Sequence, residues 1–373
     1  MSVVFLAAEG DPSWQVAGLT VAERTRRAFD VAGVNPAREA PGPRLVVARD
    51  ALLEPDAVRA LSAEGDPTLA RVLDGADAPA AARLPEDVAL PADAPALTRA
   101  LDALRAQGRV EPLAVDARCQ RVRTRAEAAR VERAMLDALI QPTDGFFARH
   151  FDRHVSIRFS LALLRLGVAP NTITLAATAI GLAGAWLLAS AAIPVQVLGA
   201  LLFILSTILD GSDGEVARLG LRQSDFGRKL DLACDNVVNG AVFLAIGWVT
   251  LRGDTSALAW FAVGATLFGV AFASAVGFWY SSWLDKSGRD GEALHAYESL
   301  ASRDWAYLVL GLAIFGKLPW LIWAAALGSN AVGVLLIVLR LRGWPPPSAA
   351  ATNDPSDDAA AVPPAVRADG EWA

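Results

Sequence analysis

Four aspartates at fixed spacing are the residues of this chain best suited to chemistry. Asp210 and Asp213 are separated by one helical turn, as are Asp231 and Asp235, so each pair shares a helix face. Each pair borders a long apolar run, which places both at the mouths of consecutive membrane helices. Uncompensated carboxylates would repel one another there, whereas clustered oxygen ligands suit a hard cation such as Mg²⁺, Mn²⁺ or Ca²⁺. The spacing therefore predicts a divalent-metal site.

The alternative interpretation is a set of solvated acidic helix ends at the membrane surface. A single aspartate would favour that alternative, but a longer pattern, D-x2-D-G-x2-A-R-x8-G-x3-D-x3-D, surrounds these four. It resembles the signature of the CDP-alcohol phosphotransferases, membrane enzymes that make phospholipids and related phosphodiesters. All fixed positions are filled, by Asp210, Asp213, Gly214, Ala217, Arg218, Gly227, Asp231 and Asp235.

The resemblance implies that an alcohol hydroxyl attacks the β-phosphorus of a CDP-linked donor and that CMP leaves. It assigns Mg²⁺ or Mn²⁺ to Asp210, Asp213, Asp231 and Asp235, with Asp235 as general base and Asp231 as the second catalytic residue. The segment from Pro170 resembles the family's P-N-x-[IV]-T. The implied nucleotide-binding residues are Gly214, Ala217, Arg218, Gly227, Asn171 and Thr174. Helix packing by small residues is the alternative for Gly214 and Ala217, and helix initiation is the alternative for Asn171 and Thr174.

Composition limits the class of protein. The chain has 373 residues, 54% of them hydrophobic, and a net charge of -6, so we expect no nucleic-acid partner. Two isolated cysteines, Cys119 and Cys234, argue against a disulfide scaffold and a zinc site. Met1 is not followed by a basic segment and a long apolar core, so we expect no cleavable signal peptide.

Residues 1–140 carry frequent charges and short apolar runs. Strand patterns at 3–8 and 44–48 alternate with a helix pattern at 21–32, and a last helix is expected at 126–140. This alternation predicts a soluble α/β, Rossmann-like domain with a parallel sheet. Its start resembles a sugar-nucleotide transferase domain, as in the fused inositol-phosphate cytidylyltransferase/di-inositol-phosphate-phosphate synthases.

The expected phosphate loop of that nucleotidyltransferase-like domain is acidic. It reads Glu9-Gly10-Asp11-Pro12-Ser13-Trp14, and no lysine precedes Lys229, although phosphates need a glycine-rich basic loop. Asp50 matches one metal-binding aspartate of such domains, while the second is lost around residues 122–125. We therefore expect a degenerate, non-catalytic domain; an active cytidylyltransferase is the alternative.

The remaining chain divides into three parts. Residues 141–168 are expected to form a juxtamembrane amphipathic helix, which lies either in the membrane interface or against the soluble domain. Residues 169–342 predict the phosphotransferase membrane domain, and residues 343–373, rich in Pro, Ala, Asp and Ser, a disordered tail. Six transmembrane helices are expected, at about 171–190, 194–217, 230–251, 257–283, 305–316 and 318–339.

Basic residues predict the orientation. They crowd residues 149–165, 218–229, 286–303 and 340–342, whereas only Arg252 and Lys317 fall on the other side. Both termini and the aspartates are therefore expected in the cytoplasm, in an integral protein of a bacterial-type inner or plasma membrane. Some of these basic residues, Arg228 and Lys229 among them, have an alternative interpretation, which is that they bind a phosphorylated acceptor.

The expected partners are an alcohol acceptor, membrane lipid and a CDP-linked donor, either CDP-diacylglycerol or CDP-inositol; a homodimer is compatible with the resemblance. Two other functions would use the same aspartates, a membrane divalent-cation transporter and a non-catalytic scaffold. A transport path needs polar residues deep in the spans, and residues 237–249 offer only Asn239.

Overall fold

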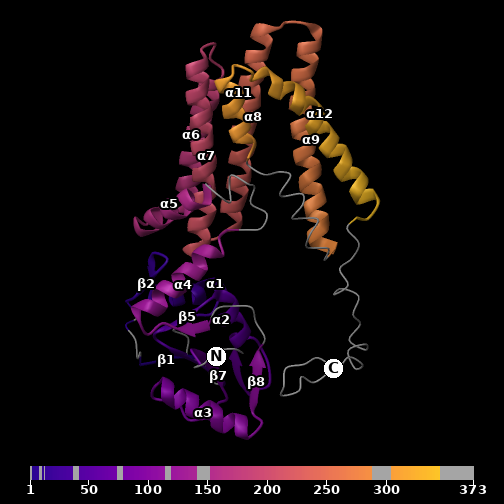
Figure 1. The fold of residues 1–373 in the computed structure, drawn as a ribbon. Coiled ribbons are helices and arrows are strands. Elements are labelled where there is room, and N and C mark those ends of the chain that lie inside the picture. Colours follow the sequence, from indigo (N-terminus) through magenta and orange to yellow (C-terminus); the bar gives the residue numbers. More distant parts are fainter. Residues whose placement is uncertain are drawn as a thin grey trace, which may run out of the picture. The chain divides into compact units, whose positions relative to one another are not determined.

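The structure is a computed structural model, and it describes residues 2–7, 11, 13–36, 42–73, 79–113, 119–140, 152–287 and 304–344 (Figure 1). These residues form two compact units. The first contains the N-terminal domain together with residues 152–178 and 208–234, and the second contains residues 179–207 and the chain from residue 235 onward. The boundary between the units passes through the interior of three continuous helices.

The N-terminal domain is built on a mixed five-stranded sheet. Its order is β1 (Ser2–Leu6), β4 (Arg44–Ala48), β7 (Ala81–Leu84), β6 (Ala70–Leu73) and β8 (Val110–Leu113). The β1–β4 and β6–β8 pairs are parallel, but β7 is antiparallel to both of its neighbours. The prediction of a parallel sheet is therefore wrong. The connection through residues 74–80 is too short for a parallel crossover, which takes about a dozen residues or more.

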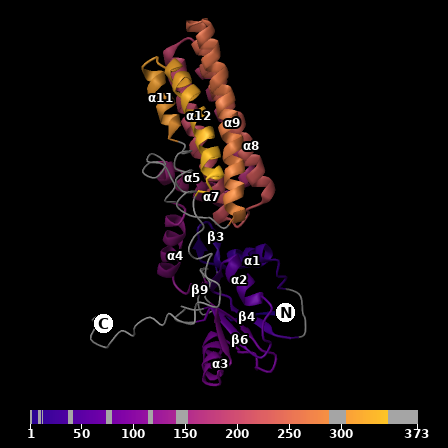
Figure 2. The same ribbon diagram turned by 90° about the vertical axis from the view of Figure 1, so that its right-hand side faces the viewer.

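Helices cover both faces of this sheet (Figure 2). Val46 and Val47 are adjacent in β4 and point to opposite faces. Val47 joins Phe29 in one buried cluster, while Val46 joins Leu97 and Leu101 in another. The helices are α1 (Val21–Ala32), α2 (Pro55–Ser62), α3 (Ala94–Ala106) and α4 (Arg125–Asp137). Two short antiparallel pairs complete the domain, β2 (Gln15–Val16) with β3 (Leu19–Thr20) and β5 (Ala51–Leu53) with β9 (Cys119–Arg121).

Local signals explain several of these bounds. The helix expected at 21–32 and the strand expected at 44–48 are confirmed. Thr20 caps α1 by accepting a hydrogen bond from the Glu23 amide, and Gly33 ends it in the left-handed conformation. Thr124 and Glu127 form a capping box at the start of α4.

The rest of the described chain is helical. It comprises α5 (Arg153–Arg165), α6 (Pro170–Leu188), α7 (Ile193–Leu219), α8 (Asp225–Gly253), α9 (Ala257–Ser287), α11 (Trp305–Ile314) and α12 (Pro319–Leu341). Five of these helices, α6 to α9 and α12, are long and apolar enough to cross a membrane. The protein is therefore an integral membrane protein. At the fifth expected span, 305–316, lies α11, whose ten residues rise only about 15 Å.

The juxtamembrane helix is present in part. Residues 141–151 lie outside the described residues, and α5 covers most of the rest of the expected segment. Leu164 of α5 is buried in a cluster with Val16 and Val21 of the N-terminal domain, while Phe159 and Leu166 are exposed. Of the two interpretations, the structure thus supports packing against the soluble domain at the C-terminal end of the helix. Residues 345–373 of the expected tail also lie outside the described residues.

Candidate active site

Three of the four aspartates form a cluster. Asp210 lies near the C-terminal end of α7, and Asp231 and Asp235 are one turn apart near the start of α8. Each offers a carboxylate oxygen, and these oxygens lie within 4.8 Å of one another. Asp210 is buried, and the buried Oδ1 atom of Asp231 has no hydrogen-bond partner among the described residues. Closely spaced carboxylate oxygens of this kind fit a divalent cation, as the spacing predicts.

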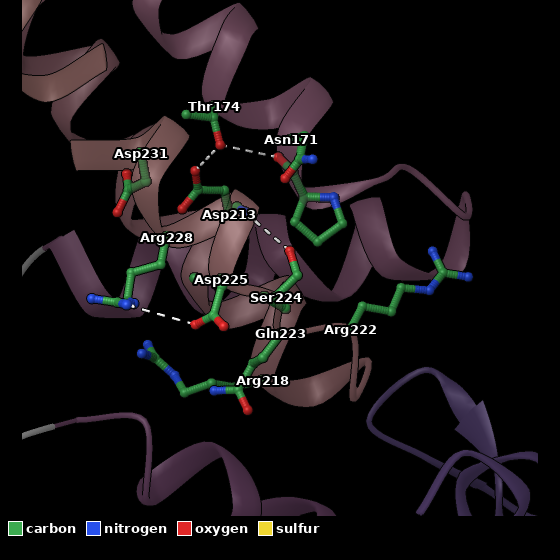
Figure 3. Close-up of a pocket in the computed structure, with 14 residues that line it drawn as sticks. Asn171, Thr174, Asp213, Arg218, Arg222, Gln223, Ser224, Asp225, Arg228 and Asp231 are labelled. Carbon is green, nitrogen blue, oxygen red and sulfur yellow. Dashed lines mark hydrogen bonds and ion pairs between the residues drawn. The ribbon is translucent and has the colours of Figure 1, made fainter. Parts of the chain in front are cut away.

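Asp213, the fourth predicted ligand, is not a member of this triad, although it lines the same cavity as Asp231. Its Oδ2 atom accepts a hydrogen bond from the Thr174 hydroxyl, and both side chains are buried. Thr174 lies in the first turns of α6, whose N-terminal end therefore contacts α7 through this bond (Figure 3). The structure thus joins two predicted site residues, Thr174 and Asp213, in an interaction that their spacing does not reveal.

A cavity of about 650 Å³ opens beside these residues, within the usual size range for small-molecule sites (Figure 3). It gathers every predicted nucleotide-binding residue from α6, α7 and α8. Its lining consists of Pro170, Asn171, Thr174, Asp213, Gly214, Ala217, Arg218, Arg222, Gln223, Ser224, Asp225, Gly227, Arg228 and Asp231.

Comparison with known proteins assigns this region. Residues 167–289 match the model of a protein family described as CDP-alcohol phosphatidyltransferase. This part of the chain is similar to that family, over about a third of the chain's length. The match begins just before α6 and includes the whole of the aspartate motif.

Relatives of known name align with part of the chain. The bifunctional IPC transferase and DIPP synthase of Thermococcus kodakarensis is 35% identical over 132 residues, which are 35% of this chain and 29% of that protein. The phosphatidylinositol phosphate synthase of Streptomyces avermitilis is 33% identical over 137 residues, 36% of this chain and 52% of that protein. A crystal structure of the Mycobacterium tuberculosis phosphatidylinositol phosphate synthase with CDP-DAG bound has 22% identity and a TM-score of 0.40, covering 50% of this chain and 92% of that one.

The cavity includes residues that the sequence pattern leaves unassigned. Four of them follow α7 or begin α8: Arg222, Gln223, Ser224 and Asp225. Ser224 caps α8, because its Oγ atom accepts a hydrogen bond of 3.0 Å from the Gly227 amide. Arg228, considered for acceptor binding but not assigned, also lines the cavity. A serine three residues before Gly227 is a helix-start signal that identifies this loop as part of the site.

The two motif glycines have different roles in the structure. A Cβ atom on Gly214 would meet only the Arg218 guanidinium, at 3.8 Å, so this face of α7 is open to the cavity. A Cβ atom on Gly227 would lie 3.1 Å from both Asn171 Oδ1 and Ser224 Oγ. Gly227 therefore allows α8 to approach α6 closely, whereas helix packing does not explain Gly214.

We predict that Gly214→Leu weakens CDP binding by about tenfold or more without lowering thermal stability, since the new side chain would fill cavity space rather than a helix contact. Titration calorimetry with CDP and a melting curve in detergent measure the two quantities. Gly264→Leu is the matched control, because Gly264 is exposed on α9 and has nothing within 4 Å of its Cβ position. A lower melting temperature with unchanged CDP affinity would restore the helix-packing interpretation.

Glu215 lies inside the motif but is turned to a different neighbour. Its side chain is fully buried, and Oε1 lies 2.9 Å from Arg153 Nη1. The Ser156 hydroxyl donates to Oε1 at 2.7 Å and the Ser160 hydroxyl to Oε2 at 2.8 Å. All three partners belong to α5, so Glu215 fixes α5 to the helix that carries Gly214.

Proposed function

We propose that the protein is a membrane CDP-alcohol phosphotransferase, which moves a phosphoalcohol or phosphatidyl group from a CDP-linked donor to an alcohol acceptor and releases CMP. One observation carries the proposal: six of the eight motif residues line a single cavity, and the other two, Asp210 and Asp235, form the triad with Asp231, which lines it. Two relatives are named as a DIPP synthase and a phosphatidylinositol phosphate synthase, so we include phospholipid or inositol-phosphodiester biosynthesis in the proposal. CDP-diacylglycerol and CDP-inositol are the candidate donors.

The residues divide the work by position. Asp210, Asp231 and Asp235 would hold Mg²⁺ or Mn²⁺, which supplies charge neutralisation for a diphosphate when bound. Asp235 is the proposed general base for the acceptor hydroxyl. Asp213 remains a proposed fourth ligand, oriented by the hydrogen bond from Thr174.

The nucleotide would occupy the neighbouring cavity. There Arg218 offers a planar set of donors for a phosphate or the cytosine carbonyl. Ala217 and Gly214 leave that part of the α7 surface free of large side chains, and Asn171 and Gly227 close the cavity from α6 and α8.

We further propose that the chain crosses the membrane six times. Helices α9 and α12 lie side by side and run in the same direction (Figures 1 and 2). Thr266 donates to the Ile322 carbonyl near their starts, and Arg340 donates to the Trp279 carbonyl near their ends. Two spans that run in the same direction need a return crossing between them, to which α11 would contribute.

This topology agrees with the charge distribution. With six crossings both termini and the site lie on one side, which we propose is the cytoplasmic side of the membrane. Arg252 and Lys317 then mark the opposite side, next to the ends of α8 and α11. The basic residues that flank the proposed cytoplasmic ends of the helices are Arg218, Arg222, Arg228, Lys229, Arg340 and Arg342.

The test is CMP release by the purified full chain in detergent with Mg²⁺ or Mn²⁺. Each candidate donor is combined with a panel of acceptors that includes inositol phosphate, glycerol phosphate and free inositol. We expect CMP from one donor class, dependent on both the acceptor and the metal. No CMP across the panel, together with cation uptake into proteoliposomes, would favour the transporter, and the absence of both would favour the scaffold.

For the N-terminal domain we predict no cytidylyltransferase activity. Asp50 is fully buried, and one guanidinium binds both of its oxygens, with Arg121 Nη2 at 2.7 Å from Oδ2 and Nε at 3.1 Å from Oδ1. A carboxylate paired in this way is poorly placed to bind a metal. The full chain incubated with CTP, Mg²⁺ and inositol phosphate should release pyrophosphate only at the background rate. Release that Asp50→Asn abolishes would show that the domain is active.

A further inference from the structure

The C-terminal end of α7, directly after the motif arginine, has an unusual cap. The Gly220 amide donates to the Val216 carbonyl, the Leu221 amide to Arg218 and the Arg222 amide to Ala217. This is a Schellman motif, with Leu221 at the position that favours glycine. The motif satisfies the carbonyls of residues 216–218 and leaves those of Leu219 and Gly220 without a partner from the helix itself.

Two arginines of the N-terminal domain bind those two carbonyls. Arg24, which is buried, donates from Nη2 to the Leu219 carbonyl at 2.8 Å and to the Val16 carbonyl at 3.2 Å. Arg27 donates from Nη1 to the Gly220 carbonyl at 2.8 Å. Guanidinium groups at a helix C-terminus also oppose its negative dipole, and hydrogen bonds from charged donors are stronger than neutral ones. Helix α1 of the soluble domain thus completes the cap of α7.

Leu221 supplies a third contact. Its φ angle is 50°, in the left-handed region that disfavours a residue with a Cβ atom. Its side chain packs against the buried cluster of the N-terminal domain that contains Phe29, Leu53 and Val58. Glycine would adopt this backbone without strain but would lose the contact, so the leucine anchors the loop in the domain core.

The segment that follows this cap runs between two cavities. On one side of it lies the donor cavity, and on the other a second cavity of about 570 Å³, which α1, α2 and α4 help to line. Arg218 and Gln223 line both cavities. The contacts of Arg24, Arg27 and Leu221 fix the end of α7 from which this segment starts, next to the buried Leu219.

We propose that the N-terminal domain is a positioning element for the donor site, acting through Arg24, Arg27 and the contact that holds Leu221. None of these three residues lines the donor cavity or belongs to the aspartate triad. They hold the end of α7 and the loop after it, which place Arg218, Arg222 and Gln223 in the wall of the donor cavity. The consequence for catalysis rests on the proposed phosphotransferase function, but the bracing of the loop does not.

The experiment compares Arg24→Gln, Arg27→Gln and Leu221→Gly with Arg26→Gln in the full chain. Arg26 is the matched control, because it lies on the same helix with its side chain 67% exposed, and within the described part of the chain its one ion pair is with Asp30, at 4.0 Å. Hydrogen–deuterium exchange of residues 218–228 reports on the loop without any assay of activity. We expect exchange there to rise by about tenfold or more in the three variants and not in the control.

Steady-state CMP release then separates positioning from stability. We expect KM for the CDP-linked donor to rise by about tenfold while KM for the acceptor stays constant, and Arg24→Lys to recover part of the loss. A purely structural role would reduce the active fraction, and so apparent kcat, at unchanged KM, which would overturn the proposal. So would exchange equal to that of Arg26→Gln. If the wild-type chain releases no CMP, the phosphotransferase function fails, but the exchange data still decide whether the domain braces the loop.

Discussion

Replacing Asp231 with asparagine is expected to lower CMP release by about a thousandfold or more, a loss of about 4 kcal/mol of transition-state stabilisation. Asp231 is the aspartate that both belongs to the triad and lines the cavity. Its buried Oδ1 has no hydrogen-bond partner among the described residues, so the carboxylate is available to a cation. Asparagine keeps the size but removes the charge, and the weakened site would no longer neutralise a diphosphate.

Metal binding can be measured without an assay of turnover, by the effect of Mn²⁺ on the melting temperature. A ligand that binds only the folded protein raises its stability, so Mn²⁺ should raise the melting temperature of the wild type and not that of Asp231→Asn. Asp254→Asn is the control, because Asp254 is exposed just beyond the opposite end of α8 and the substitution changes the same charge. Equal Mn²⁺ stabilisation in all three proteins, or unchanged CMP release by Asp231→Asn, would contradict the metal assignment.

The triad was predictable because helix geometry alone determines most of it. Asp231 and Asp235 share a face of any helix that contains both, and the short link from α7 to α8 leaves Asp210 few places other than opposite them. The hydrogen bond that Asp213 accepts from Thr174 was not predictable in the same way. Its partner Thr174 lies on a different helix, and which faces of α6 and α7 meet is decided by packing along their whole length.

The sheet shows a different limit. Alternating strand and helix patterns correctly predicted an α/β domain, because each pattern depends only on local periodicity. Strand direction depends on the connections, and the antiparallel β7 follows β6 through residues 74–80 with no room for a crossover. The hydrogen bonds from Arg24 and Arg27 to the end of α7 are still harder to predict from the sequence. Arg24 and Leu219 are 195 positions apart, and Arg27 and Gly220 are 193 positions apart.

Substituting Glu215 with alanine is expected to destabilise the protein by about 3–5 kcal/mol, because it leaves the Arg153 guanidinium without its buried partner. Glu215 is fully buried and Arg153 is only 15% exposed, so water cannot replace the lost carboxylate well. Ser156 and Ser160 lose their carboxylate acceptor at the same time and keep only the longer contacts to the Arg153 and Ser212 carbonyls, at 3.4 and 3.2 Å. A heating series in detergent, scored by the fraction that remains monodisperse, measures the loss. Glu86→Ala, at an exposed position after β7, should change stability by no more than about 0.5 kcal/mol.

The double variant Arg153→Met/Glu215→Leu shows whether Glu215→Ala is destabilised by the loss of an ion-pair partner for Arg153 or by the loss of packing. Replacing a whole buried ion pair by apolar residues is often close to neutral, so the double variant should be more stable than Glu215→Ala. A double variant at least as unstable as the single one would mean that shape, not charge, fixes α5 to α7. Because Glu215 directly follows Gly214, loosening α5 should also reduce CDP affinity in Glu215→Ala, and the double variant should recover that affinity along with stability.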